Sequence, residues 1–388
     1  MDRDPAETAR HAFQALAADA RDTLAARPRT TIRPAPHSVR TDEHVALRQL
    51  AELQLRAGAL NYGATLGQGG MGLVREATQL SVGRPVAVKQ LRPEVAHQGA
   101  TVRLLQEGWA TGALEHPNVV PVHDMGLDEL GRPFIVLKRI AGDDWASLLA
   151  DPDEVCRRFE VRDAIEWHIG TLIQVSQAVE YAHSRGILHR DLKPDNVRVG
   201  SYGEVYVLDW GIAVSLGDNR DGRLPLACDV TELAGTPCYM APEMLEGDGE
   251  RLGPRTDVYL LGALLYEVLY GRPPHAGTTA MQMLLQVAIS QPPFDEGPPA
   301  ELIALCRAAL AKDPSDRPPS AEAIGTALRR HLRHRAAIDL ADRATARLTA
   351  LEVATDGDDA HVQRVFGECR FGFRQALEVW PESEVAAA

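Results

Sequence analysis

The sequence predicts an α+β fold in which a small antiparallel, β-rich lobe precedes a larger helical lobe. Two changes of pattern along the chain predict it. From about residue 60 to residue 140, short apolar runs alternate with turn residues, as in the strands of an antiparallel sheet. From residue 141 on, the pattern is mostly helical. With 388 residues, 45% of them hydrophobic and 24% charged, the chain can bury two or three cores.

An extension of 59 residues precedes the β-rich lobe. Residues 1–27 have helical composition, and residues 28–42 (PRTTIRPAPHSVRTD) have the composition of a flexible linker. A second helical pattern at 44–60 places leucines on one side. We therefore expect helical segments joined by a Pro/Arg/Thr linker over residues 1–59.

The β-rich lobe spans residues 60–140. Its expected strands are the runs YGATLG, GLVREATQ, PVAVKQL, VVPVHD and PFIVLKRI, with a helix-like segment at 101–115 between the third and the fourth. In the helical lobe, residues 141–331, short β-like runs interrupt the helical pattern near residues 186–213. The apolar run VYLLGALLYEVLYG at 258–271 is too short to span a membrane and contains Glu267, so we expect a buried core helix.

Charge and composition exclude several classes of protein. A net charge of −13 argues against a general nucleic-acid binder, which would present a basic face. The basic run at 329–335 fits the solvated end of a helix. The first residues are acidic where a signal peptide would be basic, and no apolar run reaches the ~18 residues of a membrane span. The five cysteines lack metal-ligand spacing, so we expect a reduced, cytoplasmic compartment and no zinc.

A glycine-rich run, LGQGGMGLV, lies between the first two expected strands. It comprises Leu66, Gly67, Gln68, Gly69, Gly70, Met71, Gly72, Leu73 and Val74. Glycine allows a backbone to lie close over phosphate groups, although such a pattern alone fits a hairpin turn equally well. The strand-loop-strand setting disfavours a dinucleotide fold, which needs a strand followed by a helix.

Lys89 lies in the expected strand PVAVKQL, where alternation places it on the same side as Ala87. A lysine buried in this way needs anionic partners, which phosphate oxygens and one carboxylate would supply. Glu107, in the following helix-like segment, is the candidate carboxylate. Taken singly, Glu107 would be an ordinary surface glutamate.

The octapeptide HRDLKPDN at 189–196 is the most specific motif. Asp191 can orient an incoming hydroxyl and accept its proton, and Lys193 can neutralise charge on a transferring group. Asn196 offers a neutral oxygen to a metal ion. In the later run YVLDWG, Asp209 is the natural ligand for Mg²⁺, which prefers carboxylate and phosphate oxygens.

Taken in order, these motifs resemble the protein-kinase signature over roughly residues 60–331. The set is Gly67, Gly69 and Gly72, then Lys89, Glu107, HRDLKPDN, DWG, Ala241-Pro242-Glu243, Asp257 and Arg317. GQGGMG together with HRDLKPDN resembles the bacterial eukaryotic-like (Hanks-type) serine/threonine kinases, because tyrosine kinases differ where Lys193 stands. The resemblance implies a bilobal fold, ATP and Mg²⁺ as cofactors, and Ser/Thr hydroxyls of proteins as acceptors.

The resemblance also assigns roles to further residues. Leu137 would be the gatekeeper and Lys138 to Ile140 the hinge, with Val74 and Ala87 above the adenine. Glu243 would pair with Arg317, and Asp257 would hold the catalytic loop from beneath. In the activation segment, the resemblance implies that Thr236 contacts Asp191 and Lys193, while Thr231 is the expected autophosphorylation site. It also implies that Arg190, which precedes Asp191, binds the phosphorylated segment. Arg198 departs from the pattern, because an apolar residue usually forms the floor of the adenine site; its aliphatic stem could still pack on the ring.

Two alternatives remain beside an active protein kinase. A pseudokinase scaffold would bind nucleotide without efficient transfer, but such proteins normally lack Lys89, Asp191 or Asp209, and only Arg198 favours this alternative. A small-molecule phosphotransferase would lack the LKP after the catalytic aspartate and the Ala-Pro-Glu segment.

A helical tail, residues 332–388, follows the kinase-like region. Its second amphipathic pattern has an apolar stripe of Phe366, Phe371, Phe373, Leu377 and Trp380. The stripe either packs on neighbouring helices or binds a protein partner. FGFRQALEVWP resembles the start of the helical-repeat regions that related bacterial kinases have after the catalytic domain.

Overall fold

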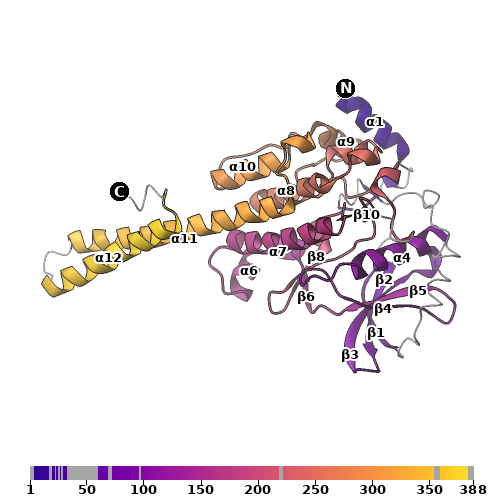
Figure 1. Ribbon diagram of the computed structural model, residues 1–388, viewed down its shortest axis with the longest axis horizontal. Helices are drawn as coiled ribbons and strands as arrows, with labels where there is room; N and C mark the ends of the chain where they lie inside the picture. Colours follow the sequence, from indigo (N-terminus) through magenta and orange to yellow (C-terminus); the bar gives the residue numbers. More distant parts are fainter. Residues whose placement is uncertain are drawn as a thin grey trace. The chain divides into compact units, whose positions relative to one another are not determined.

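The computed structural model describes residues 4–16, 20–21, 23–24, 27, 29–32, 60–68, 72–95, 98–217, 222–353 and 359–382. Within it the chain divides into two compact units, residues 1–325 and 326–388. The first unit has the predicted α+β fold, which is thereby confirmed (Figure 1). The helix expected from residue 44 falls almost wholly outside the described residues.

A five-stranded antiparallel sheet forms the small lobe, in the order β1-β2-β3-β5-β4. Its strands are β1 (Leu60–Gln68), β2 (Gly72–Gln79), β3 (Arg84–Leu91), β4 (Val122–Leu127) and β5 (Pro133–Lys138). The strand expected from residue 119 begins later, because Val119 and Val120 pair with Val207 in the other lobe instead.

Alternation gives the sheet two different faces. Val86 and Val88 of β3 pack with Phe134 and Val136 of β5 on one face. The other face packs against helix α4 (Gln98–Gly112) through Ile135. Lys89 pairs with Ile135 in the register of β3 and β5, so its side chain lies on the α4 face.

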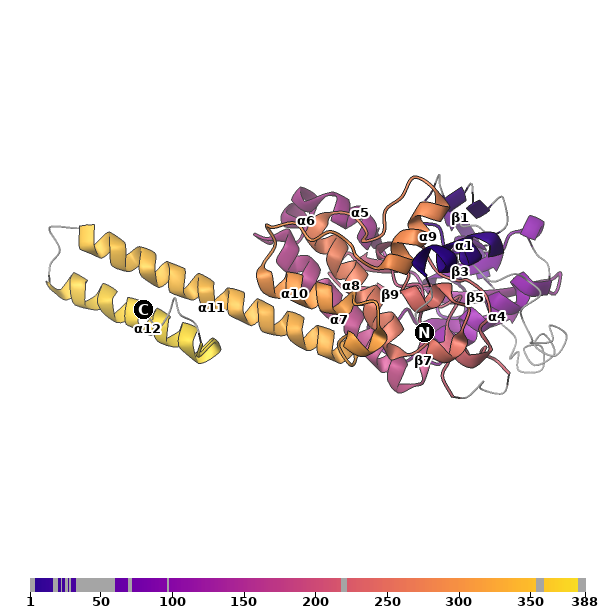
Figure 2. The same ribbon diagram turned by 90° about the horizontal axis from the view of Figure 1, so that it is seen from above.

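Helices dominate the larger lobe (Figures 1 and 2). They are α5 (Trp145–Ala150), α6 (Pro152–Arg158), α7 (Ala164–Ser184), α8 (Pro254–Tyr270), α9 (Ala280–Ile289) and α10 (Ala300–Ala309). Helix α8 contains the apolar run noted in the sequence and is buried along nearly its whole length, Glu267 included. It packs against α7 and α10, as the buried core helix expected there should.

Two small antiparallel sheets lie where the sequence predicted β-like runs. One contains β6 (Gly142–Asp144), β8 (Val197–Gly200) and β9 (Val205–Val207), and the other pairs β7 (Ile187–Leu188) with β10 (Val214–Ser215). The catalytic motif lies between β7 and β8, and Asp209 follows β9. The ladders of β7 with β10 and of β8 with β6 and β9 fix the strands that flank both segments.

The N-terminal extension packs on the helical lobe. Helix α1 (Pro5–Ala15) is capped by Asp4, whose side chain accepts a hydrogen bond from the amide of Ala6. Its buried Ala9 and Ala12 face α9, and both views show α1 beside α9 (Figures 1 and 2). The sequence predicted a flexible linker from residue 28, but residues 29–32 are held in place by hydrogen bonds to the helical lobe.

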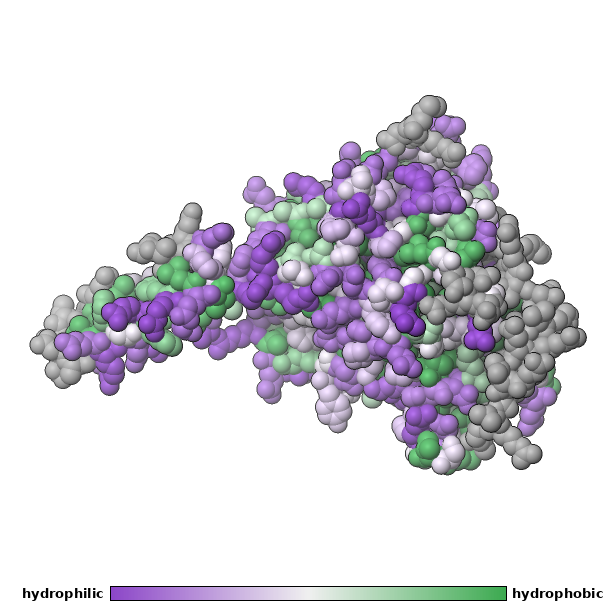
Figure 3. Space-filling view, in the orientation of Figure 1, coloured by the Kyte–Doolittle hydropathy of each residue, from purple (hydrophilic) through white to green (hydrophobic). Residues whose placement is uncertain are grey.

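Helix α11 (Ala321–Val353) continues from the first unit into the second, where it packs against α12 (Asp359–Val379). Ala337, Ala341 and Ala376 form the buried seam, and Trp380 stacks on the His334 ring. Hydrophobic patches also remain visible on this hairpin among hydrophilic side chains (Figure 3). None of the described helices has the length and apolar character needed to cross a lipid bilayer.

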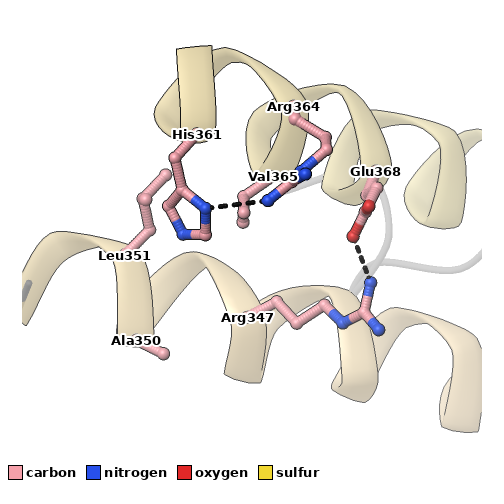
Figure 4. A pocket seen from close by; sticks show the side chains of 7 residues that line it. All are labelled: Arg347, Ala350, Leu351, His361, Arg364, Val365 and Glu368. Atoms are coloured by element: carbon pink, nitrogen blue, oxygen red, sulfur yellow. Dashed lines mark hydrogen bonds and ion pairs between the residues drawn. The ribbon is translucent and has the colours of Figure 1, made fainter. Parts of the chain in front are cut away.

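The predicted apolar stripe of the tail divides between two environments. Phe373, Leu377 and Trp380 pack on the seam with α11, whereas Phe366 and Phe371 are exposed. A shallow pocket between the helices is bridged by the ion pair of Arg347 with Glu368 (Figure 4). The groups there are paired with one another, so the pocket offers no catalytic arrangement.

Candidate active site

Lys89 contacts two carboxylates on the α4 face of the small lobe. Its Nζ donates to Glu107 Oε1, and it lies 3.6 Å from Asp209 Oδ1. The Lys89 and Glu107 side chains are largely buried, while Asp209 is 25% exposed. The lysine thus links the small lobe to the segment after β9, as an anion-binding lysine held by a carboxylate would.

The loop that contains Asp191 is fixed from beneath by Asp257 of α8. The fully buried Asp257 carboxylate accepts hydrogen bonds from the amides of His189 and Arg190 at 2.8 and 2.9 Å, and His183 Nε2 lies 2.8 Å away. Burial alone would raise the pKa of Asp257, but the interactions with His183 and His189 outweigh it and lower the pKa. An ionised carboxylate therefore anchors the loop, as the family resemblance implied.

His189 joins this loop to the segment of Asp209. Its Nδ1 accepts from the Asp191 amide at 3.1 Å, and its Nε2 lies 3.1 Å from the Leu208 carbonyl oxygen. The ring of Trp210, which is buried, packs on the His189 ring with centroids 4.5 Å apart. The amide of Leu208 also donates to the Asn196 carbonyl. Asp191, Asn196 and Asp209 are thus parts of one connected cluster.

The carboxylate of Asp191 accepts hydroxyl hydrogen bonds from two threonines. Thr236 Oγ1 donates to Oδ1 at 2.6 Å, and Thr31 Oγ1 donates to Oδ2 at 2.6 Å. Asn196 Nδ2 lies 3.1 Å from the same Oδ2. Lys193 Nζ donates to both threonine hydroxyls, at 3.0 Å for Thr236 and 2.7 Å for Thr31. The contacts expected for Thr236 are therefore present.

We call the surface formed by Asp191, Lys193, Gly235, Thr236 and Glu267 the acceptor surface. Residues 29–32 of the N-terminal extension lie on it. Besides the Thr31 contacts, the Arg29 guanidinium donates to Glu267, and Ile32 exchanges backbone hydrogen bonds with Gly235. The sequence pattern did not predict this contact.

The pair predicted between Glu243 and Arg317 is present and completely buried. Arg317 donates to both Glu243 oxygens at 2.7 and 2.8 Å and to the carbonyls of Arg255, Ala311 and Lys312. Such a bidentate pair, with its remaining donors satisfied, fixes the Ala-Pro-Glu segment to the rest of the helical lobe.

The other residues predicted to bind the nucleotide lie in the strands of the small lobe and at the start of the large lobe. Leu66, Gly67 and Gln68 end β1; Gly72, Leu73 and Val74 begin β2; Ala87 is in β3, and Leu137 and Lys138 end β5. Gly69, Gly70 and Met71 lie outside the described residues. Ile140 packs with Tyr206, whose hydroxyl accepts from Lys138 Nζ.

Arg198 and Thr231 have less typical surroundings. Arg198 is in β8, and its guanidinium donates to the Gly142 carbonyl at 2.6 Å, which draws its charged end toward β6. Thr231 is exposed in the activation segment. Arg190, expected to bind a phosphorylated segment, is fully buried, and burial lowers its pKa to about 10 against the opposing charges of Asp257 and Asp191.

Sequence reasoning missed three residues of this site: Arg29, Thr31 and Glu267. For Glu267 a signal existed, because the single carboxylate of the apolar run at 258–271 needs a partner when buried. For Arg29 and Thr31 the signal was a hydroxyl flanked by arginines in the stretch interpreted as a linker.

Comparison with known proteins identifies the family. The family model described as protein kinase domain matches residues 60–328 of this chain. A probable serine/threonine-protein kinase of Streptomyces coelicolor is 36% identical over 273 residues, which are 68% of this chain and 38% of the relative. The serine/threonine-protein kinase pkn3 of Myxococcus xanthus is 34% identical over 74% of this chain and 52% of its own length.

PknB of Mycobacterium tuberculosis, also a serine/threonine-protein kinase, is 35% identical over 66% of this chain and 40% of its own length. The matched region thus spans between about two fifths and half of these relatives. The chain belongs to the protein kinase family, in its bacterial eukaryotic-like (Hanks-type) serine/threonine branch.

Proposed function

We propose that this chain is an ATP-dependent serine/threonine protein kinase that transfers the γ-phosphoryl of Mg·ATP to Ser and Thr hydroxyls of proteins. One observation supports this most directly: the Asp191 carboxylate accepts a hydrogen bond from the Thr31 hydroxyl at 2.6 Å, while Lys193 Nζ donates to the Thr31 hydroxyl oxygen at 2.7 Å. A carboxylate that orients an alcohol and an ammonium group beside it are the parts that phosphoryl transfer to an alcohol requires.

The chemistry on the acceptor side follows from these contacts. Asp191 would orient the hydroxyl and take its proton as the new O–P bond forms, within the 2.6–3.2 Å reach expected of a general base. Lys193 would offset the negative charge that develops on the transferring group. Thr236 hydrogen-bonds to both residues and thereby holds the Asp191 carboxylate in one orientation.

On the nucleotide side, Lys89 would bind phosphate oxygens while Glu107 holds it in position. The glycine-rich run would cover the phosphates, and a Cβ at Gly67 would meet no heavy atom of the described residues within 4 Å. Val74, Ala87, Leu137, Lys138, Ile140 and Arg198 would surround the adenine. These roles for the nucleotide remain proposals.

Asp209 and Asn196 fit the ligand set of Mg²⁺. This ion takes one or two protein carboxylates and completes its shell with phosphates and water. Asp209 is a partly exposed carboxylate 3.6 Å from Lys89, and the Asn196 amide nitrogen faces Asp191, which leaves its amide oxygen for a metal. A bound Mg²⁺ would neutralise charge on the phosphates.

The bounds of the kinase domain, the location of the chain and its partners are also proposals. The kinase domain would cover residues 60–331 and act in the cytoplasm, where its phosphoryl donor ATP is supplied, and the chain's acidic charge favours protein over nucleic-acid partners. The tail, residues 332–388, would bind a protein partner; Phe366 and Phe371, each 56% exposed, support this.

Transfer from γ-labelled ATP tests the proposed function. The full chain is incubated with Mg²⁺, labelled ATP and a basic protein, beside an Asp191→Asn variant, and label is located by mass spectrometry. We expect label on Ser and Thr in the parent, and a loss of at least ~100-fold in the variant, because the amide cannot accept the proton. Nucleotide binding without transfer in the parent would favour the scaffold alternative.

A further inference from the structure

The backbone of the N-terminal extension pairs with the acceptor surface as an added strand would. Ile32 N donates to Gly235 O at 2.6 Å, and Gly235 N donates to Ile32 O at 2.8 Å, in an antiparallel bridge. Gly235 has φ +125°, a conformation that residues with a side chain rarely adopt. These two bonds fix the backbone next to Thr31 without regard to side chains, as in strand-addition modes of peptide recognition.

Two residues before Thr31, the Arg29 side chain enters an acidic site. Its guanidinium donates to Glu267 and lies 3.7 Å from Asp195. The Glu267 side chain is 2% exposed, and its other carboxylate oxygen accepts from the Tyr239 hydroxyl at 2.6 Å. Burial raises the pKa of Glu267, while Tyr239 and the charge of Arg29 oppose that rise. A carboxylate buried in this way requires a cation to stay ionised.

Between these two anchors, the Thr31 hydroxyl meets the chemical groups that would act on it. It donates to Asp191 Oδ2 at 2.6 Å, the distance of a charge-assisted O–H···O bond. Lys193 Nζ contributes all three of its donors here, to Thr31 Oγ1, Thr236 Oγ1 and the Arg29 carbonyl. A segment that only packed on the lobe would not need its hydroxyl at the carboxylate of the catalytic loop.

We propose that Thr31 is a phosphorylation site of this chain, modified in cis by the chain's own Asp191. This inference rests on the proposed kinase function. In the reaction, the Thr31 Oγ1–Pγ bond forms as the bond between Pγ and the β,γ-bridging oxygen of ATP breaks. ADP leaves with the bonding pair, and the proton of the hydroxyl passes to Asp191 and then to solvent. The products are phosphothreonine 31 and ADP.

Because acceptor and catalytic groups belong to one chain, their effective concentration is independent of the protein concentration. Helix α1 packs on α9, and Leu24 and Ile32 are buried, so the extension contacts the lobe at several points besides Thr31. After transfer, the phosphate dianion would face the Asp191 carboxylate, and like charges would weaken the contact. The modified segment would then leave the acceptor surface.

The full chain, stripped of phosphate by a phosphatase, provides the test. It is incubated with Mg·ATP and an isotopically heavy Asp191→Asn chain, and Thr31 peptides of both masses are quantified. We expect phosphate on Thr31 of the light chain only, at a rate per molecule that stays constant over a ~100-fold range of concentration. Thr30→Ala, which changes the neighbouring hydroxyl, should keep this modification. Hydrogen exchange at residues 29–32 and 235 should increase after it.

Two results would overturn the inference. One is an unmodified Thr31 in a preparation that phosphorylates an added basic protein, which leaves the kinase function intact. The other is equal modification of the heavy chain, which would make the reaction intermolecular. Failure of transfer to every hydroxyl would instead refute the proposed function and, with it, the inference.

Discussion

The guanidinium of Arg29 forms an ion pair with Glu267, a buried carboxylate in the last turn of helix α8. The Glu267 carboxylate accepts a hydrogen bond from the Tyr239 hydroxyl, and Tyr239 follows Thr236 of the acceptor surface by three residues. The kinase unit therefore contains a buried anion that binds the residue two positions before the hydroxyl at Asp191. An external protein substrate that replaces residues 29–32 would meet the same carboxylate.

Substitution of Glu267 by Gln should abolish a preference for arginine at that position of the substrate. Hydrogen bonds to charged groups contribute about 1.5–3 kcal/mol, so the parent should favour a peptide with Arg two residues before its Thr about tenfold or more in kcat/KM over one with Leu. The variant should use both peptides equally. An unchanged ratio in a variant with the parent's thermal stability would contradict the assignment of Glu267.

Substitution of Arg29 by Ala should raise the initial rate on an added peptide, measured before any phosphate has accumulated. The ion pair holds the N-terminal segment on the acceptor surface, and its loss should weaken that occupancy about tenfold. Arg10→Ala is the matched control, because Arg10 is exposed on α1 and, among the described residues, its side chain donates to the Ala6 carbonyl of the same helix. Equal rates for the parent and both variants would show that the segment does not compete with substrate.

Thr231 should become phosphorylated by a different route from Thr31. It is exposed, so a second molecule can reach it, and its modification should rise with protein concentration while that of Thr31 does not. Thr231→Ala should lower activity if a phosphate there binds Arg190, as the family resemblance implied. One mass-spectrometric time course at several protein concentrations gives the phosphorylation rate of each site. A Thr231 rate per molecule that does not change with protein concentration would exclude the intermolecular route.

The sequence predicted the parts of this site that lie within motifs. Asp191, Lys193 and Asn196 are neighbours on one short loop, so local spacing alone brings them together. It could not predict that Thr31 contacts Asp191, because 160 residues separate the two and a Pro/Arg/Thr stretch has no periodicity to assign it a face. Nor could it place the Arg198 guanidinium on the Gly142 carbonyl, which depends on the pairing of β6 with β8.

The buried pair of Arg317 and Glu243 should be essential for stability. Arg317→Met would leave the Glu243 carboxylate buried without its cation, which typically costs about 3–5 kcal/mol. Arg251→Met removes the exposed pair with Glu246 and should cost less than about 1 kcal/mol. Urea unfolding followed by tryptophan fluorescence measures both, and similar midpoints for the two variants would contradict this role of the buried pair.

His275 should make the helical lobe sensitive to acid. Its ring is fully buried with Nε2 2.8 Å from the Tyr259 hydroxyl, and burial lowers its pKa from 6.5 to about 3. In the unfolded chain the imidazole therefore takes up a proton as the pH falls below 6.5, whereas in the folded chain it stays neutral down to about pH 3. Neutral His275 thus contributes stability above pH 6.5, and this contribution is lost as pH falls, at up to ~1.4 kcal/mol per pH unit.

His275→Gln should remove that proton uptake and flatten the dependence of the free energy of unfolding on pH. Between pH 6.5 and 4.5 the parent should lose about 2 kcal/mol more than the variant. His11→Gln, at an exposed position of α1, is the control and should keep the parent's slope. Because the comparison uses slopes, any constant loss of stability caused by the missing imidazole cancels. If His275→Gln kept the full slope, the acid sensitivity of the lobe would have to come from other groups.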